Sequence, residues 1–318
     1  MNGDRSLNAP FFFLLAFLLS SCAAIMKTQP QDTALPTQTP PAKTTKPANQ
    51  TNPSPQLNPT PTSTLLPTPS PTPETSSTTL YAVVGVSDDD VLNIREGPGA
   101  ENEITATIPP HSTDIQTTGE GVDVDGSKWV PIEYLGEKGW VNAYFLAEQV
   151  GKVDPELFEK SNQVLQALKE KDFRTLSDFV HPEKCLCFSP YPTLHPEDLV
   201  FCPAQIKTLA ADQTKYEWGQ FDGTGKPINM TFSEYYERFI YDVDFAHADL
   251  VGFNEVIGTG NAINNIQEYF PQAVFIEYHF PEFDPQYAGM DWRSIRLVFE
   301  KQNQEWYLVC VVHGEWTI

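Results

Sequence analysis

The stretch SIRLVFEKQNQEWYLVCVVH, residues 294–313, contains two apolar runs around a short polar segment. Successive side chains of a strand point to opposite faces of a sheet. A four-residue loop at 301–304 would pair Glu300 with Glu305 and Arg296 with Val309. In that register one face is apolar and would form core, and its residues are Ile295, Leu297, Phe299, Trp306, Leu308, Cys310 and Val312. The stretch therefore predicts a long antiparallel hairpin that packs one face against the rest of the domain.

The other face of this hairpin is polar and aromatic. It would carry Trp292, Arg296, Tyr307 and His313, joined by Glu277 and His279 if the strand at 273–280 is the neighbour. Aromatic walls around a few charged groups are typical of small-ligand pockets. The alternative is a solvated face with a surface Glu277–Arg296 pair, which would be worth about 0–1 kcal/mol. We expect these six residues to be ligand-binding candidates.

Helix signals precede the strands in residues 151–318. Asp154 and Asp172 are expected to cap two helices, and Thr231 with Glu234 forms a capping box before a third. Further strands are expected at 185–189, 198–202, 216–221, 251–257 and 273–280. Helices followed by a mostly antiparallel sheet indicate an α+β domain.

This order of elements, with KDFRTLSDFVHPE after the first helix and a final Trp-Tyr strand, resembles cystatin-like cone or nuclear-transport-factor-like folds. The segment also resembles an uncharacterised C-terminal domain of bacterial envelope lipoproteins. That second resemblance implies no activity.

Residues 151–318 contain four cysteines, which are Cys185, Cys187, Cys202 and Cys310. An even number in an exported protein indicates disulfides, and four cysteines allow three connectivities. Cys185 and Cys187 lie on one face of one strand, which disfavours a bond between them. We expect at least one bond from this strand to Cys202. The alternatives are a zinc site or a Cys187–His181 catalytic pair, and both lack the sequence motifs that usually surround them.

Catalytic and cofactor motifs are mostly absent from the sequence. No Gly-x-Ser-x-Gly, His-Glu-x-x-His or complete phosphate-binding loop occurs. The segment DVDFAHAD offers Asp242, Asp244, His247 and Asp249 as ligands for a hard metal, but a solvated acidic loop is the favoured interpretation. We expect no metal, no cofactor and no catalytic residues.

Residues 80–150 contain several short strands separated by Gly and Pro turns, which indicates a small β-barrel. The segments LNIREGPG (92–99), ATIP (106–109), WVPI (129–132), GWV (139–141) and YFL (144–146) together resemble the bacterial SH3-type domain. That resemblance implies a targeting or docking module. We expect Arg95, Trp129 and Tyr144 to form its contact surface. Because the segment has 3 basic and 13 acidic residues, a peptide with a free amine, such as one of peptidoglycan, is the favoured ligand.

The N-terminal 79 residues contain two further regions. Residues 1–21 have the short apolar core of a signal peptide, and Leu19-Ser20-Ser21-Cys22 resembles the bacterial lipobox, which implies a lipid on Cys22. Residues 22–79 are rich in Pro and Thr and predict a disordered, extended linker. Together they predict a stalk that lifts folded parts away from a membrane on the exported side.

The net charge of −22 disfavours nucleic acid as a partner. The sequence thus predicts a non-enzymatic lipoprotein of the bacterial cell envelope with four parts: signal peptide 1–21, linker 22–79, SH3-type barrel 80–150 and α+β domain 151–318. Peptidoglycan or an envelope protein is the expected partner. The alternatives are a cell-wall amidase or peptidase, targeted by the SH3-type part, and a structural spacer.

Overall fold

The structure is a computed structural model that describes residues 79–317. The expected signal peptide, Cys22 and nearly all of the linker lie outside the described residues. Within 79–317, no helix is both long and apolar enough to cross a membrane.

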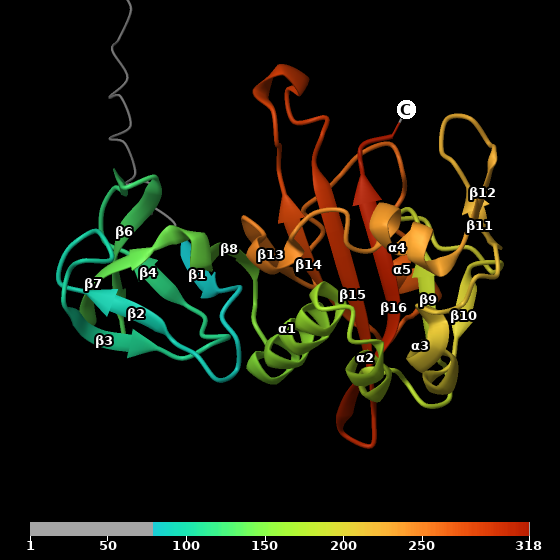
Figure 1. The fold of residues 1–318 in the computed structure, drawn as a ribbon, viewed down its shortest axis with the longest axis horizontal. Coiled ribbons are helices and arrows are strands. Elements are labelled where there is room, and N and C mark those ends of the chain that lie inside the picture. Colours follow the sequence, from blue (N-terminus) through green and yellow to red (C-terminus); the bar gives the residue numbers. More distant parts are fainter. Residues whose placement is uncertain (1–78, 318) are drawn as a thin grey trace, which may run out of the picture. The chain divides into compact units, whose positions relative to one another are not determined.

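Strands dominate the described part of the chain (Figure 1). They are β1 (Leu80–Val83), β2 (Leu92–Arg95), β3 (Ile104–Ile108), β4 (Ile115–Thr117), β5 (Val122–Val124), β6 (Ser127–Tyr134), β7 (Glu137–Asn142), β8 (Leu146–Gly151), β9 (Leu186–Ser189), β10 (Leu199–Phe201), β11 (Tyr216–Gln220), β12 (Pro227–Met230), β13 (Leu250–Phe253), β14 (Val274–Phe280), β15 (Arg293–Gln302) and β16 (Glu305–Glu315).

Fourteen of these strands form one mixed sheet, in the order β10-β9-β16-β15-β14-β13-β8-β1-β4-β6-β7-β2-β3 with β5 beside β6. Two of the pairings, β13 with β8 and β16 with β9, are parallel. β8 pairs with both β1 and β13, so it crosses the expected boundary at 150/151 and joins the strands of both segments. The remaining strands, β11 and β12, make a separate hairpin.

Five helices accompany the strands, and three of them were expected. They are α1 (Pro155–Lys169), α2 (Phe173–Phe179), α3 (Pro203–Leu209), α4 (Phe232–Phe239) and α5 (Ile266–Tyr269). Asp154 and Asp172 cap α1 and α2, and the capping box of Thr231 and Glu234 begins α4, as predicted. Helix α3 was not predicted, although Pro203 occupies its first turn. The Gln205 side chain accepts a hydrogen bond from the Cys202 amide at 2.9 Å at the start of this helix.

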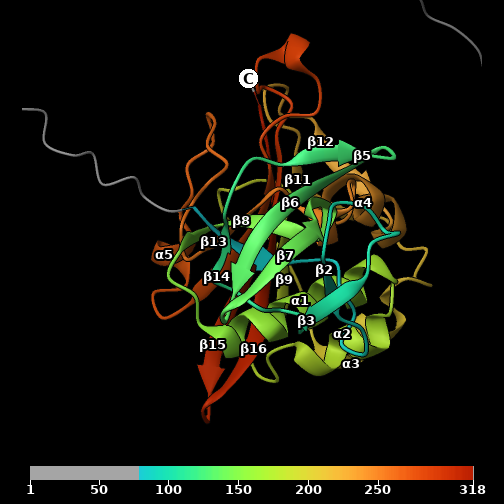
Figure 2. The same cartoon turned by 90° about the vertical axis from the view of Figure 1, so that its left-hand side faces the viewer.

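Three apolar clusters hold these elements together. Strands β1–β8 enclose a cluster that includes Leu92, Ile94 and Val141, and β6 and β7 of this group face the viewer in Figure 2. The largest cluster packs α1, α2 and α4 against one face of β13–β16. The third covers the opposite face around Val298 and Cys310. Because both faces of β15 and β16 are covered, their side chains are buried on both sides.

The turn of the β15–β16 hairpin differs from the prediction. Asn303 and Gln304 both have positive φ, at 54° and 72°, which is the conformation of a two-residue type I′ turn. Gln302 therefore pairs with Glu305, and Glu300 faces Tyr307. The predicted four-residue loop was wrong.

A bulge then changes the register again. Phe299 pairs with Leu308 but Val298 pairs with Cys310, so Val309 is an extra residue in β16. Beyond the bulge Arg296 pairs with Val312, and His313 pairs with Ile295. The predicted Arg296–Val309 pair was therefore wrong.

Candidate functional site

The expected pocket residues of β14 and β15 form a buried ion pair. Arg296 and Glu277 face each other across the two strands, and both are 0% exposed. Arg296 Nε donates to Glu277 Oε2 at 2.9 Å, and Nη2 donates to Oε1 at 3.1 Å. Ile257 N, Gly258 N and Ser294 Oγ also donate to the carboxylate, at 3.0, 2.8 and 2.6 Å. The alternative of a solvated face was wrong, because backbone from the loop after β13 covers the pair.

His279 extends this network. The hydroxyl of Ser294 gives its one proton to Glu277, so His279 Nδ1, which lies 2.8 Å from Ser294 Oγ, must be the donor in that contact. Burial lowers the pKa of His279 to about 4, with Arg296 adding to the shift and Glu277 opposing it. The ring is therefore neutral at neutral pH, and the arrangement is that of a structural hydrogen-bond chain.

Only four of the six hairpin candidates come together. Trp292 packs against His279, with ring centroids 5.7 Å apart. His313 points to the opposite sheet face, where its Nε2 lies 3.4 Å from Asp242 and its ring meets Phe239. Tyr307 lies at the other end of the hairpin beside His181. The six-residue pocket was therefore wrong, because the bulge at Val309 moves His313 to the other face.

The three candidates of β1–β8 also do not share one exposed surface. Trp129 is only 6% exposed. Arg95 is half-buried, and its Nη1 donates to the carbonyl of Asn102 at 2.7 Å. Tyr144 is 57% exposed, but one face of its ring stacks on His247 with centroids 4.1 Å apart. The burial of Trp129 contradicts its expected place on a contact surface, because little of its side chain is accessible to a partner.

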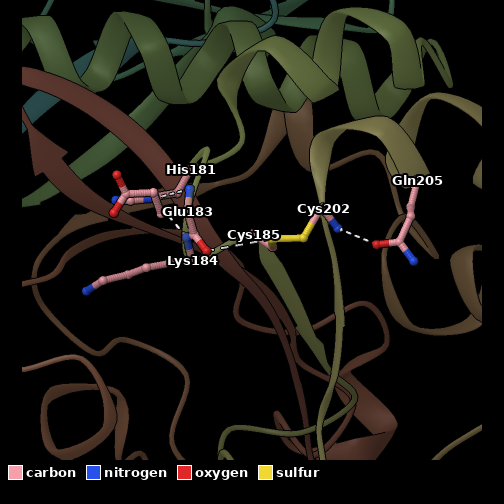
Figure 3. Close-up of a disulfide and its surroundings, with 6 residues drawn as sticks. All are labelled: His181, Glu183, Lys184, Cys185, Cys202 and Gln205. Carbon is pink, nitrogen blue, oxygen red and sulfur yellow. Dashed lines mark hydrogen bonds between the residues drawn. A yellow bond between two sulfur atoms is a disulfide. The ribbon is translucent and has the colours of Figure 1, made fainter.

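All four cysteines of residues 79–317 are in disulfides. Cys185 is bonded to Cys202, as expected, and the bond closes the base of the β9–β10 hairpin (Figure 3). Cys187 is bonded to Cys310 and joins β9 to β16. Cys187 is thus not a free thiol, and His181 Nδ1 instead accepts from the amides of Glu183 and Lys184.

Two of the three carboxylates in the acidic segment 242–249 are engaged in ion pairs. Asp242 binds Arg293 at 3.0 Å, and Asp244 binds Lys169 and His247 at 3.0 and 2.9 Å. Within residues 79–317, no three His, Cys, Asp or Glu side chains converge closely enough to hold a metal ion.

A cavity of about 640 Å³ lies outside all of these predicted sites. We call it the acidic cavity. Three segments of the chain build it: the loop between β9 and β10, the β11–β12 hairpin, and residues 261–263. Its aromatic lining residues are Tyr191, Trp218 and Phe221, and its acidic ones are Glu197, Asp198, Glu217 and Asp222.

Hydrogen bonds fix the first and third segments to each other. Thr193 Oγ1 donates to the carbonyl of Ile263 at 2.7 Å. The Asn265 side chain accepts from Leu194 N at 2.7 Å and donates to Leu194 O at 3.0 Å. The β9–β10 hairpin, whose loop forms this wall of the cavity, is thus held at its base by the Cys185–Cys202 bond and at its loop by these hydrogen bonds.

The second segment places aromatic rings at the cavity. Trp218 is 2% exposed, stacks on Tyr235 with centroids 3.9 Å apart, and donates its indole N–H to Met230 O at 2.9 Å. Gly219 follows with φ of 113°, where the β11–β12 register shifts. This conformation favours glycine and changes the direction of the chain before Phe221. Within the segment YEWGQFDGTG (216–225) only a strand at 216–221 was predicted, and the Gly-rich turn that follows its aromatic residues is the signal that was missed.

The carboxylates have unlike environments. Glu197, Glu217 and Asp222 are exposed, whereas Asp198 is half-buried and accepts from His195 N at 2.9 Å. Burial raises the pKa of Asp198, although the hydrogen bonds to its carboxylate oppose the shift. An adjoining cavity of about 450 Å³ contains Arg238, which binds Glu315 at 2.6 Å. The acidic cavity itself is lined by no Lys or Arg among the described residues.

A second carboxylate-lined cavity, of about 420 Å³, lies between residues 85–89 and α1. It is smaller, and its only aromatic lining residues are His111 and Phe179. The acidic cavity combines more volume with more aromatic surface and is therefore the better candidate ligand site.

Comparison with known proteins adds little. No family model matches the sequence, and neither does any curated protein. A solved structure from Xanthomonas campestris, described as a calcium/calmodulin dependent protein kinase II association domain, is similar over 52% of this chain and 89% of that one, at 13% identity. The TM-score is 0.23, which is too low to carry an argument about fold or function.

Proposed function

We propose that this protein is a non-enzymatic binding protein of the bacterial cell envelope, which captures a ligand in the acidic cavity. The observation that carries the proposal is the cavity itself: about 640 Å³, with aromatic walls and a rim of carboxylates. This size and mixture of apolar surface with a few polar groups are typical of small-ligand sites.

The architecture around the cavity supports binding rather than a purely structural role. The cavity wall is fixed by a disulfide and by three side-chain hydrogen bonds. A site that is already ordered loses less conformational entropy when a ligand binds. A protein that only spaces other parts apart binds no ligand, so an ordered cavity wall would give it no such advantage.

The fluorescence of Trp218 tests the cavity proposal without any assumption about the ligand. This tryptophan lines the cavity, so an occupied cavity should change its fluorescence. We expect envelope extract to change the emission of the wild type and to leave a Trp218→Phe variant, which has lost the reporter, with a smaller response. Equal responses from the two proteins would place the binding elsewhere.

The second part of the proposal is the membrane anchor. The sequence LSSC at 19–22 supports lipidation of Cys22, and two disulfides among residues 185–310 fit an oxidising, exported location. Labelling with an alkyne palmitate should tag the wild type and not Cys22→Ser. An unchanged membrane fraction for Cys22→Ser would contradict the anchor.

The third part is docking through an SH3-type barrel formed by β1–β8. The motif set at 92–99, 106–109, 129–132 and 139–146 supports it, as does the separate apolar cluster that these strands enclose. Peptidoglycan is the proposed partner. The full chain should sediment with isolated sacculi at low salt, and the failure to do so at low and at high salt would contradict docking.

The hydrolase alternative lacks its expected nucleophile, because Cys187 is disulfide-bonded. Zymography on purified cell wall tests it directly. A clearing zone produced by the purified protein would replace the binding proposal with an enzymatic one.

A further inference from the structure

We infer that the acidic cavity binds its ligand through an ammonium group, carried on a body of about the size of a sugar or a dipeptide. This inference rests on the proposal that the cavity is the ligand site. It adds the chemical class of the ligand, which the comparisons and the sequence leave open.

The charge of the lining points to a cation. Glu197, Asp198, Glu217 and Asp222 all line the cavity, and the described lining residues include no Lys or Arg to balance them. The basic side chain among them is the exposed imidazole of His195. The one nearby guanidinium, Arg238, lines the adjoining cavity and is already bound to Glu315. An anionic ligand would meet only repulsion from these carboxylates, whereas an ammonium group would be attracted by all four.

The carboxylates are spread around the cavity rather than gathered at one point. Glu197 and Asp198 come from the β9–β10 loop, and Glu217 and Asp222 come from the start and the tip of the β11–β12 hairpin. A metal ion needs several ligands within about 2.0–2.6 Å of one point, and no such group of three exists in residues 79–317. Dispersed carboxylates instead suit an organic cation, which extends over several ångströms.

The aromatic side chains provide the second feature. Tyr191 and Phe221 are only half-buried and line the same cavity, so they present ring surface to a ligand. Aromatic rings attract ammonium groups through their negative faces and also pack against the apolar face of a sugar or a peptide. Carboxylates without aromatic rings would not select for the body of the ligand, and this cavity has both.

Asp198 is the carboxylate that the cavity shields best. It is half-buried, and its position is fixed by the hydrogen bond from His195 N to Oδ2 at 2.9 Å. Burial raises the pKa of this carboxyl, which means that the ionised form is short of favourable partners. An ammonium group placed beside it would supply that partner.

The test compares ligands with and without a charged amine. The probes are the glucosamine disaccharide chitobiose with its N,N′-diacetyl form, and Nα-acetyl-lysyl-alanine amide with its Nα,Nε-diacetyl form, in which no free amine remains. We expect isothermal titration of the full chain to show that each free amine binds at least tenfold more tightly than its acetylated partner. The two pairs also separate the possible sources, because one presents the ammonium on a sugar and the other on a peptide.

Variants then locate the binding. Asp198→Asn keeps the shape of the side chain and its ability to accept from His195, but removes the charge, so it should weaken binding of the free amine about tenfold. Glu217→Gln should weaken it less, because this carboxylate is exposed. The matched control is Glu282→Gln, an exposed carboxylate on the loop after β14, which should bind as the wild type does. Circular dichroism of each variant confirms that it is folded.

The outcomes separate this inference from the proposed function. If the acetylated probes bind as tightly as the free amines, and Trp218 responds, the cavity is a ligand site but the inferred ammonium is wrong. If no probe binds, the inferred class is also wrong, and the response to envelope extract alone then decides the proposed function. If Asp198→Asn and Glu282→Gln bind equally well, the ammonium does not enter this cavity and the inference is overturned.

Discussion

Replacing Arg296 by Met should destabilise the protein far more than the loss of an ordinary ion pair. The side chains of Arg296 and Glu277 are both fully buried, and Arg296 makes three of the hydrogen bonds in this network, two to Glu277 and one from Nη2 to Gly258 O at 2.7 Å. Met fills a similar length without charge, so the Glu277 carboxylate would stay buried without its counter-ion. Breaking a buried pair in this way costs about 3–5 kcal/mol.

Urea unfolding of the wild type and the variant at pH 7.5 measures this cost. The matched control is Lys138→Met, which removes a pair of similar length to Glu133 at 3.0 Å, with side chains 70% and 42% exposed. That surface pair should contribute at most about 1 kcal/mol. The double variant Arg296→Met/Glu277→Leu should recover part of the loss, because it leaves no unpaired charge inside.

Two results would refute this reasoning. A loss below about 1 kcal/mol for Arg296→Met would mean that water or a rearranged loop reaches the carboxylate. If the double variant loses more unfolding free energy than the two single variants lose together, the two residues do not act as a pair.

Two further predictions concern protonation and the disulfides. Because the pKa of His279 is lowered to about 4 in the folded protein, from about 6.5 in the unfolded chain, the unfolded state takes up the proton first as the pH falls. The free energy of unfolding should therefore lose about 3 kcal/mol between pH 6.5 and pH 4 on account of this residue. His279→Asn should show a shallower loss in urea unfolding at pH 7.5 and 4, and equal losses in the two proteins would contradict the assignment. The disulfides close loops of unequal length, with sequence separations of 17 for Cys185–Cys202 and 123 for Cys187–Cys310. Replacing the two cysteines of one disulfide by Ala should lower the free energy of unfolding by about 3 kcal/mol for the short loop and by about 5 kcal/mol for the long one. A larger loss for the short loop, measured by denaturant unfolding, would show that loop length does not set the effect.

The local signals of the sequence predicted local structure well. Asp154 accepts from the amide of Leu157 at 3.2 Å, and Thr231 with Glu234 makes the expected capping box. These signals succeed because a cap depends on a side chain and on amides two or three residues away. The Glu277–Arg296 pair was proposed as part of the alternative interpretation, and the two residues do face each other across β14 and β15, although they are buried and not solvated.

The acidic cavity could not be predicted in the same way. Its walls come from three segments that are separated by up to about 70 residues, and the contact that joins two of them runs from Thr193 to Ile263. The Gly-rich turn near Phe221 is a signal within one segment, but no segment alone indicates that it meets the other two. Their convergence depends on how β9, β10 and the β11–β12 hairpin pack, and no sequence spacing encodes that arrangement.

The bulge at Val309 shows why the sequence predicted the wrong pocket. Simple alternation places Cys310 and His313 on opposite faces, and the predicted register assigned His313 to the face of Arg296. In the structure, Val298 pairs with Cys310 and Ile295 pairs with His313, so Cys310 lies on the face of Val298 and Arg296, and His313 lies on the other face. One extra residue reverses the assignment of every later side chain of β16 relative to β15. A bulge at an apolar residue such as Val309 leaves no trace in hydrophobic periodicity, because both faces of this strand are buried.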